Sequence, residues 1–371
     1  MSSGLRDDLI VLSRAIHGAP ELAYQERQAV ANITALLRRH GHDVEARYGG
    51  LETAFRARVG PKGPAVALLA EYDALPEIGH ACGHNLIAMS NVGAFLLAAQ
   101  RHKQLQVGIE LIGTPAEESG GGKIDLLDAG VFGESVAVLS SHPGGNEWEF
   151  GRSSLGIVGR LVRFHGVASH AAYSPQQGRN ALSAALRLFL AVDGGRQHLP
   201  ADTRVHGIIT KGGAASNIIP DLAECDFGLR AASLDVLEEM DRTFRQMADG
   251  AAMQTGTTVE VNDKMRLYAP ILPNPAIGAL IGEELSRRKI PFVNEGLVLA
   301  STDFGNVSQQ VPADYIGFPV STEPVPGHSH HMREASASDL AHTNAVLTAE
   351  MLASVAVRIA TDAALRGSLG T

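Results

Sequence analysis

The chain has 371 residues, of which 45% are hydrophobic and 19% charged, and its formal net charge is −9. This length predicts two domains or three, and the negative charge argues against a nucleic acid or an anionic membrane as the main partner. The two cysteines, Cys82 and Cys225, exclude a disulfide-stabilised scaffold and suit a reducing compartment, so we expect a cytoplasmic protein. No apolar run approaches the roughly 20 residues of a membrane span, so no membrane anchor is expected. The N-terminal residues do not resemble a signal peptide.

The first 150 residues alternate between helical and strand-like patterns. Apolar residues recur at helical spacing over residues 4–40. Short apolar runs that are typical of buried strands follow at 64–70, 106–113 and 136–140. This alternation predicts an α/β domain with a mostly parallel sheet, in which functional residues gather at the carboxyl ends of the strands.

The pattern changes after Gly151. Strand, helix, strand, strand, helix and strand are predicted in turn at 156–166, 179–193, 204–210, 222–230, 235–250 and 258–262. This order is typical of a ferredoxin-like α+β sandwich. We therefore predict that residues 155–263 form a domain inserted into an α/β domain made of residues 1–154 and 264–371, with hinges near Leu155 and Asp263. A helix at 337–365 closes the chain.

Cys82 and His84 stand one residue apart in the segment GHACGHN at 79–85. A thiolate and an imidazole at this spacing suit a borderline-soft divalent cation. The alternative is a small, inert cysteine in an apolar core, and the motif alone does not decide between them.

Two adjacent carboxylates, Glu117 and Glu118, follow the second predicted strand. Adjacent carboxylates repel each other unless a cation compensates them. At a metal site, one could be a ligand while the other accepts a proton from water. The alternative is a solvated acidic loop. The glycines before Lys123 do not form a phosphate-binding loop, because Ile124 occupies the place of the required Ser or Thr.

Single histidines extend the set of candidate ligands. His142 ends the third apolar run, and His328 opens the cluster HSHH at 328–331. Asp73, which follows the first run, could orient a ligand by hydrogen bonding. Each residue alone is ambiguous, but candidates that follow successive strands of one sheet can converge in space.

These motifs together resemble the di-metal amidohydrolases of the aminoacylase and carboxypeptidase type, peptidase family M20, subfamily D. The resemblance runs from residues 17–26 to His342 and includes GVASHAA at 166–172 and GGAASNIIPD at 212–221 in the inserted domain. Within the subfamily, Asn85 and the segment STDFGNVS at 301–308 resemble aminobenzoyl-glutamate hydrolase B subunits and the related cytosolic dipeptidases and N-acyl-amino-acid hydrolases.

The resemblance implies a zinc-exopeptidase-like catalytic domain that holds two divalent cations, Zn²⁺ or Mn²⁺, with Co²⁺ or Ni²⁺ also compatible. Cys82 would bridge the cations, and the remaining implied ligands are His84, Glu118, His142 and His328. Glu117 would be the general base and later the proton donor, and Asp73 would orient the metal site. The implied substrate-binding residues are His170, Asn217 and, as a weaker candidate, Arg230; His170 would also be catalytic by polarising the substrate carbonyl. The Gly-His-Ser spacing favours His328 over His330 and His331.

In the family, the histidine that corresponds to His170 typically reaches the site from a partner subunit. The resemblance therefore implies a homodimer formed through the inserted domain, which would also close as a lid. The expected substrate is an N-acyl or N-aroyl amino acid or a dipeptide with a free carboxylate. One alternative is a non-catalytic, metal-binding partner subunit of a hydrolase complex. Another is a thiol nucleophile at Cys82 with a histidine base, which leaves Glu118, His142 and His328 unexplained.

Overall fold

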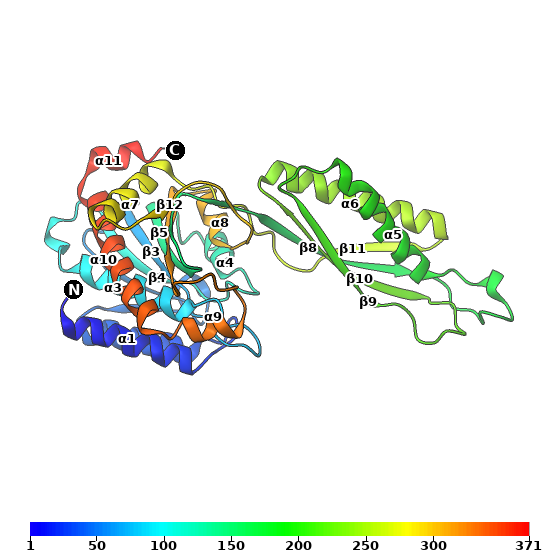
Figure 1. Cartoon of the computed structure of the whole chain (residues 1–371), viewed down its shortest axis with the longest axis horizontal. Coiled ribbons are helices and arrows are strands. Elements are labelled where there is room, and N and C mark those ends of the chain that lie inside the picture. The colour runs from blue at the N-terminus through cyan, green and yellow to red at the C-terminus, as the bar shows by residue number, and fades with distance from the viewer. Residues whose placement is uncertain (371) are drawn as a thin grey trace. The chain divides into compact units, whose positions relative to one another are not determined.

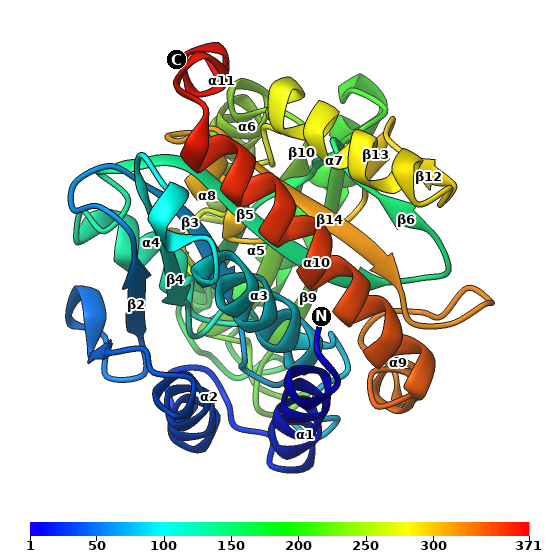
Figure 2. The ribbon, with the colours of Figure 1, turned by 90° about the vertical axis from the view of Figure 1, so that its left-hand side faces the viewer.

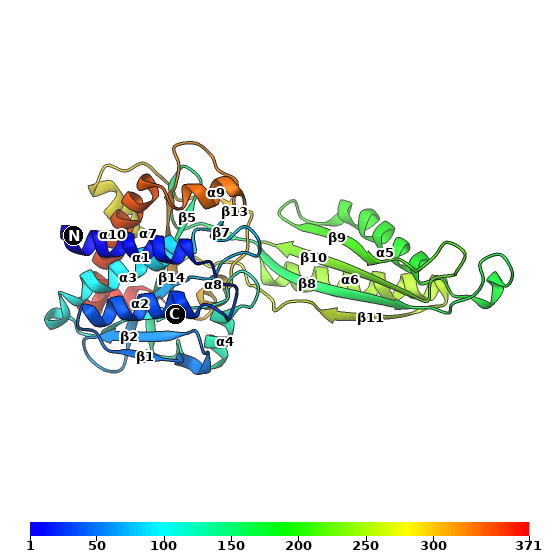
Figure 3. The same cartoon turned by 90° about the horizontal axis from the view of Figure 1, so that it is seen from below.

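The structure, a computed structural model, describes residues 1–370 and divides into two compact units. Unit 1 contains Met1–Ser153, Ile271–Leu297 and the chain from Thr302 onward. Unit 2 contains Ser154–Pro270 and Val298–Ser301. Figures 1 and 3 show the elements of each unit, and the units are described separately below.

Unit 1 is built on an eight-stranded sheet with the order β1-β2-β4-β3-β5-β14-β6-β12. The strands are β1 (Val44–Ala46), β2 (Phe55–Val59), β3 (Ala65–Ala70), β4 (Gly108–Gly113), β5 (Ser135–Gly144), β6 (Trp148–Glu149), β12 (Phe292–Val293) and β14 (Ala313–Pro319). The four central strands, β4-β3-β5-β14, are parallel to one another, whereas β2 joins β4 antiparallel. The mostly parallel sheet expected from the sequence is therefore confirmed.

Helices cover both faces of this sheet. The helices of unit 1 are α1 (Ser3–Gly18), α2 (Arg27–Arg39), α3 (His84–Ala99), α4 (Gly122–Asp128), α7 (Pro275–Arg287), α8 (Phe304–Ser308), α9 (His330–Ala335), α10 (Asp339–Thr361) and α11 (Ala363–Ser368). Two short strands, β7 (Ser153–Ser154) and β13 (Leu297–Val298), lie where the chain passes between the units.

The core of unit 1 explains why β3 reads as an unbroken apolar run. Val66, Leu68 and Ala70 pack with α3 and α10 on one face of the sheet. Ala67 and Leu69 pack on the other face, in the cluster that includes residues of α4 and α8. A parallel strand covered on both faces has no solvent side, so the alternation of polar and apolar residues disappears. Figure 2 shows α3 and α10 lying across the near face of the sheet.

The helix α10 is long and apolar enough to cross a membrane, but 67% of its most apolar window is buried inside the structure. Helices that are hydrophobic all round are also typical of the core of a large domain, and the packing of α10 against α3 and β14 accounts for this one. The helix expected at 337–365 is interrupted at Asp362, whose extended backbone and side chain cap α11.

The connections of the parallel strands create a switch in direction beside β3. The chain leaves β3 through α3 to reach β4 on one side, then crosses through α4 to β5 on the other side. In open α/β sheets, such a switch point leaves a crevice at the carboxyl ends of the adjacent strands, where ligands bind. A functional site is therefore expected at the carboxyl ends of β3 and β5.

Unit 2 has a four-stranded antiparallel sheet with the order β11-β8-β10-β9 and two helices on one of its faces (Figures 1 and 3). Its elements in chain order are β8 (Gly156–His165), α5 (Ala181–Gly195), β9 (Arg204–Lys211), β10 (Leu222–Ala231), α6 (Leu234–Thr255) and β11 (Thr258–Asp263). Both the chain order and the strand order are those of a ferredoxin-like sandwich. Cys225 is fully buried in its core.

The limits of unit 2 differ from the boundaries expected at residues 155 and 263. The unit continues to Pro270 because Lys264 donates its backbone N–H to Gly159, and Tyr268 pairs with Ile157 through both backbone groups. The segment Val298–Ser301 also belongs to it, with a backbone hydrogen bond from Leu155 to Ala300. The chain thus passes between the units four times rather than twice.

An ion-pair network around Asp241 stabilises unit 2. Asp241 on α6 accepts hydrogen bonds from Arg160 and Arg245. Burial raises the pKa of Asp241, but the two arginines lower this pKa by a larger amount. The net shift of the pKa is therefore downward. The stability that comes from a lowered carboxyl pKa is fully present at pH values above the unfolded-state pKa, which is near 4. It is lost as the pH falls through the native-state pKa.

We expect Asp241→Asn to destabilise the protein by about 1–2 kcal/mol at pH 7, since the network is partly exposed to solvent. The difference from the wild type should shrink at pH 3, where the wild-type carboxylate is also losing its charge. Urea unfolding at both pH values measures it, with Asp249→Asn on the exposed side of α6 as the control. An equal loss of stability at both pH values would contradict the electrostatic explanation.

Candidate metal centre

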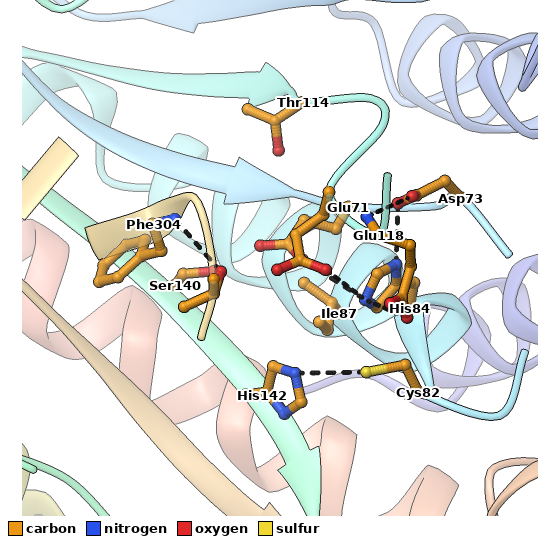
Figure 4. A network of polar contacts seen from close by, with 12 residues as sticks. Glu71, Asp73, Cys82, His84, Ile87, Thr114, Glu118, Ser140, His142 and Phe304 are labelled. Carbon is orange, nitrogen blue, oxygen red and sulfur yellow. Dashed lines mark hydrogen bonds and ion pairs between the residues drawn. The ribbon is translucent and has the colours of Figure 1, made fainter. Parts of the chain in front are cut away.

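The sequence candidates of unit 1 meet at the carboxyl ends of three parallel strands (Figure 4). Asp73 follows β3, and Glu117 and Glu118 follow β4. His142 lies within β5 rather than after it, because this strand runs four residues beyond the predicted end at 140. Its position at the carboxyl end of β5 still directs it to the crevice expected beside β3.

A tight turn places Cys82 and His84 on the same side as His142. Gly83 between them has a backbone φ of +78°, and a Cβ there would lie 2.5 Å from a side-chain carbon of Pro143. Only glycine fits both the backbone conformation and the space. The turn leaves Cys82 Sγ 3.7 Å from Nε2 of His142, and His84 begins α3 with its ring edge-on to that of His142.

Asp73 fixes the orientation of His84. The Nδ1 of His84 lies 2.9 Å from one carboxylate oxygen of Asp73, and the other oxygen accepts the backbone N–H of Glu118. A histidine that donates from Nδ1 to a carboxylate presents Nε2 as a free lone pair, which is the form of a metal ligand. His142 is oriented similarly, with Nδ1 2.8 Å from the carbonyl oxygen of Pro143, and burial lowers its pKa and favours the neutral ring.

Glu118 faces two histidines from its two carboxylate oxygens. Its Oε1 lies 3.8 Å from Nε2 of His84, and its Oε2 lies 3.6 Å from Nε2 of His328. His328 adopts a left-handed backbone with φ of +54° and donates its N–H to the carbonyl of Ala81. This bond ties the C-terminal loop to the residue before Cys82. Neither His330 nor His331 joins a group of candidate ligands in the described part of the chain.

These side chains fit two divalent cations. Cys82, His84 and His142 form one group of close ligand atoms, and Cys82 also belongs to a second group with Glu118 and His328. Ligands at roughly 2.0–2.3 Å from a tetrahedral cation are about 3.3–3.7 Å apart, and the separations above, 3.6–3.8 Å, are close to this range. The buried Nε2 of His84 and Oε1 of Glu118 have no hydrogen-bond partner. Such groups repel each other unless a proton or a metal cation lies between them, and the ligand types present suit a metal cation.

Glu117 is placed to exchange protons beside this cluster. It is buried, and its Oε2 lies 3.8 Å from Nε2 of His84. Burial raises the pKa of Glu117 well above its usual range, and the neighbouring charge of Glu118 raises it further. A carboxylate with a raised pKa can both accept and return a proton near neutral pH.

The alternative of a thiol nucleophile is disfavoured by the environment of Cys82. Burial, followed by the charge of Glu118, raises the pKa of this thiol above its ordinary value. Nucleophilic cysteines have lowered pKa values that come from cationic neighbours or helix N-termini. A cation bound between Cys82 and its neighbours would instead favour the thiolate as a ligand.

The three candidates on unit 2 separate into two places. His170 and Asn217 are both exposed and adjacent, with the N–H of Ala171 bonded to the carbonyl of Asn217. His170 Nδ1 accepts two backbone N–H groups, so a neutral ring carries its proton on Nε2. Arg230 lies at the far end of β10, about 26 Å along the strand from its start near this loop, and bonds to Ser301. In one subunit, Arg230 and His170 therefore do not contact the same anion.

The sequence interpretation missed a cluster of three buried charged residues next to the candidate ligands. Glu71, Lys123 and Asp303 lie next to one another, and each is at most 4% exposed. Glu71 stood at a predicted strand end and Lys123 after a run of glycines, but nothing local connected them to Asp303. His80 is buried and stacks on His17 without joining a ligand group among the described residues.

The comparisons with known proteins agree on one family. The model of peptidase family M20/M25/M40 matches residues 67–351. The Xaa-Arg dipeptidase of Mus musculus is 37% identical over 94% of this chain and 84% of its own length. The p-aminobenzoyl-glutamate hydrolase B subunit of Escherichia coli is 27% identical over 93% of this chain and 88% of its own length.

Solved structures share the fold of both units. A dinuclear metal-binding peptidase of the M20 family from Bacillus subtilis superposes with a TM-score of 0.77, at 20% identity, over 97% of this chain and 99% of its own. The aminobenzoyl-glutamate utilization protein of Klebsiella pneumoniae gives a TM-score of 0.71, at 20% identity, over 96% of each chain. The chain therefore belongs to peptidase family M20/M25/M40 and is a hydrolase of amide bonds, as its motifs indicated.

Proposed function

We propose that the protein hydrolyses N-acyl or N-aroyl amino acids or dipeptides with a free carboxylate, with Glu117 as general base beside two divalent cations. The observation that carries this proposal is the sharing of Cys82 by two groups of ligand atoms, with Glu117 buried next to them. A non-catalytic metal-binding subunit would not need a further buried carboxylate beside the proposed ligands. That alternative is therefore disfavoured.

The ligand set suits several metals. The proposed ligands are Cys82, His84, Glu118, His142 and His328. Thiolate and imidazole ligands accept Zn²⁺, Mn²⁺, Co²⁺ or Ni²⁺, and availability often decides among them; we propose Zn²⁺ or Mn²⁺. Divalent cations in such a site activate water and polarise a carbonyl group.

The chain's own residues supply the proton transfers. Glu117 takes a proton from the attacking water on one of its carboxylate oxygens and later gives it to the leaving amine. Asp73 holds both His84 and the backbone of Glu118, so the ligand next to the base keeps one orientation. The Nε2–H of the exposed His170 would stabilise the oxyanion that forms on the substrate.

The names of the relatives support the substrate class. Xaa-Arg and p-aminobenzoyl-glutamate, the substrates named for the mouse and bacterial relatives, are both amides of an amino acid. Amine release from N-acetyl, N-benzoyl and aminobenzoyl amino acids and from dipeptides tests the proposal. Each substrate should be compared with its α-carboxamide. Faster cleavage of the free acids supports carboxylate recognition, whereas equal rates would exclude it.

We also propose that unit 2 forms a homodimer and closes as a lid over the partner's substrate. Its strand β9 lies at an edge of the sheet and exposes Ile208, and α5 exposes Leu190. An open strand edge with apolar side chains is a common template for pairing with a second copy. Tyr173 next to His170 is 88% exposed, which is consistent with a loop that contacts another subunit.

Two free cysteines further support a cytoplasmic location.

The dimer proposal predicts complementation between inactive variants. Glu117→Gln and His170→Ala should each lose most activity, His170→Ala by about 10²-fold in kcat/KM, with its metal content unchanged. If His170 acts on the partner's site, a heterodimer purified through two tags holds one complete site of its two, so about half of the wild-type activity returns. A heterodimer as inactive as the two parents would show that His170 does not act across the dimer.

A further inference from the structure

Glu71 faces the proposed metal ligands although no motif assigned it a role. It follows β3 directly and is 4% exposed. Its Oε2 lies 3.6 Å from Nε2 of His84 and has no hydrogen-bond partner. Glu71, His84 and Glu117 form a third group of close ligand atoms. Figure 4 places Glu71 and Asp73 beside the His84 ring, and the two carboxylates face its different nitrogens, Nε2 and Nδ1.

The other oxygen of Glu71 is held by a buried lysine. Lys123 Nζ lies 3.0 Å from Oε1 of Glu71 and also pairs with Oδ1 of Asp303. The second oxygen of Asp303 accepts the backbone N–H of Lys123 at 2.9 Å. Neither Lys123 nor Asp303 is exposed to solvent. Burying three charged groups is unfavourable unless each is well compensated, yet one oxygen of Glu71 lacks a donor.

The glycines before Lys123 allow this arrangement. Gly121 has a left-handed backbone with φ of +79°, and a Cβ on Gly122 would lie 1.9 Å from the carbonyl oxygen of Pro115. The chain can therefore turn sharply after Glu118 and bring Lys123, in the first turn of α4, back under Glu71. This explains the glycine-rich segment that does not match a phosphate-binding loop.

We propose that Glu71 is a sixth metal-binding side chain, which coordinates through Oε2 the cation held by His84. Lys123 and Asp303 are positioning residues that fix the other oxygen of Glu71. A ligand carboxylate whose second oxygen is held by a partner is a common way of orienting metal ligands. The inference rests on the proposed two-cation centre and adds a ligand to it.

Metal affinity tests this inference without relying on activity. Zn²⁺ binding to the apoprotein, measured by competition with a chromophoric chelator, should weaken by about 10–100-fold at one of two sites in Glu71→Gln. Lys123→Met should weaken the same site. The matched control is Glu110→Gln, which removes another buried, ion-paired carboxylate, on β4. Unchanged Zn²⁺ affinity in Glu71→Gln, or an equal loss in the control, would overturn the proposal.

A structure of the wild-type protein with Zn²⁺ decides the matter if the variants do not fold. We expect Glu71 Oε2 at about 2.0–2.2 Å from one cation; a separation beyond about 3 Å from both cations would overturn the proposal. The failure of the wider account looks different. If His142→Ala and Cys82→Ser also keep both cations, the proposed centre itself is wrong. If only Glu71→Gln keeps them, the centre stands without its sixth ligand.

Discussion

Glu117→Gln is expected to abolish nearly all turnover while both cations stay bound. The substitution keeps the size of the side chain but removes its ability to take a proton from water. General-base catalysis contributes about 10²–10⁴-fold, so kcat should fall by at least about 10²-fold. Amine release measures the loss, and metal analysis of the same sample shows that the centre is intact.

The control for this variant is Glu134→Gln, which changes an exposed carboxylate of unit 1 in the same way. We expect it to keep wild-type turnover and metal content. If Glu117→Gln retains substantial turnover, Glu117 is not the general base. If the variant instead loses its metal, Glu117 is a metal ligand, and its closeness to Nε2 of His84 reflects coordination rather than proton transfer.

Cys82→Ser is expected to disrupt both cation sites at once, because Cys82 belongs to both ligand groups. A neutral hydroxyl is a much weaker ligand than a thiolate for borderline-soft cations. Metal content after dialysis should fall from two per chain towards zero, and turnover should fall with it. Mass spectrometry of the metal-loaded and dialysed samples measures both states.

The contrast with His142→Ala makes this prediction specific. His142 belongs to one of the two groups, so its removal should release one cation and leave the site of Glu118 and His328 occupied. Equal losses in Cys82→Ser and His142→Ala would argue against a bridging thiolate. Unchanged metal content in Cys82→Ser would remove Cys82 from the ligands.

The sequence predicted those parts of the fold whose pattern lies within a few neighbouring residues. Apolar runs predicted β3 and β4, since strands covered on both faces carry a continuous apolar sequence. The order of short elements predicted the sandwich of unit 2. The sequence interpretation did not locate β2, because its arginines interrupt the apolar pattern. Arg56 and Arg58 pair with Glu110 on the neighbouring strand, and such a partner more than 50 positions away has no local signal.

The residues of the candidate site likewise divide into those that lie in local motifs and those that only folding brings together. Cys82, His84 and Glu118 follow strand ends, so their residue types and spacing made them candidates, and the family resemblance implied their role as ligands. Lys123 and Asp303 lie 180 positions apart, and only the folded chain brings them together beneath Glu71. The segment 298–301 joins unit 2 through a backbone hydrogen bond with Leu155. No change of composition along the sequence predicts this contact.

The most direct test of the central claim is amine release from an N-acyl amino acid or dipeptide before and after metal removal. The account predicts that a chelator abolishes cleavage and that Zn²⁺ or Mn²⁺ restores it to the dialysed protein. Glu117→Gln treated in parallel should stay inactive after the same addition. Cleavage that continues unchanged in the metal-free protein would contradict hydrolysis at a centre built from Cys82 and its neighbours.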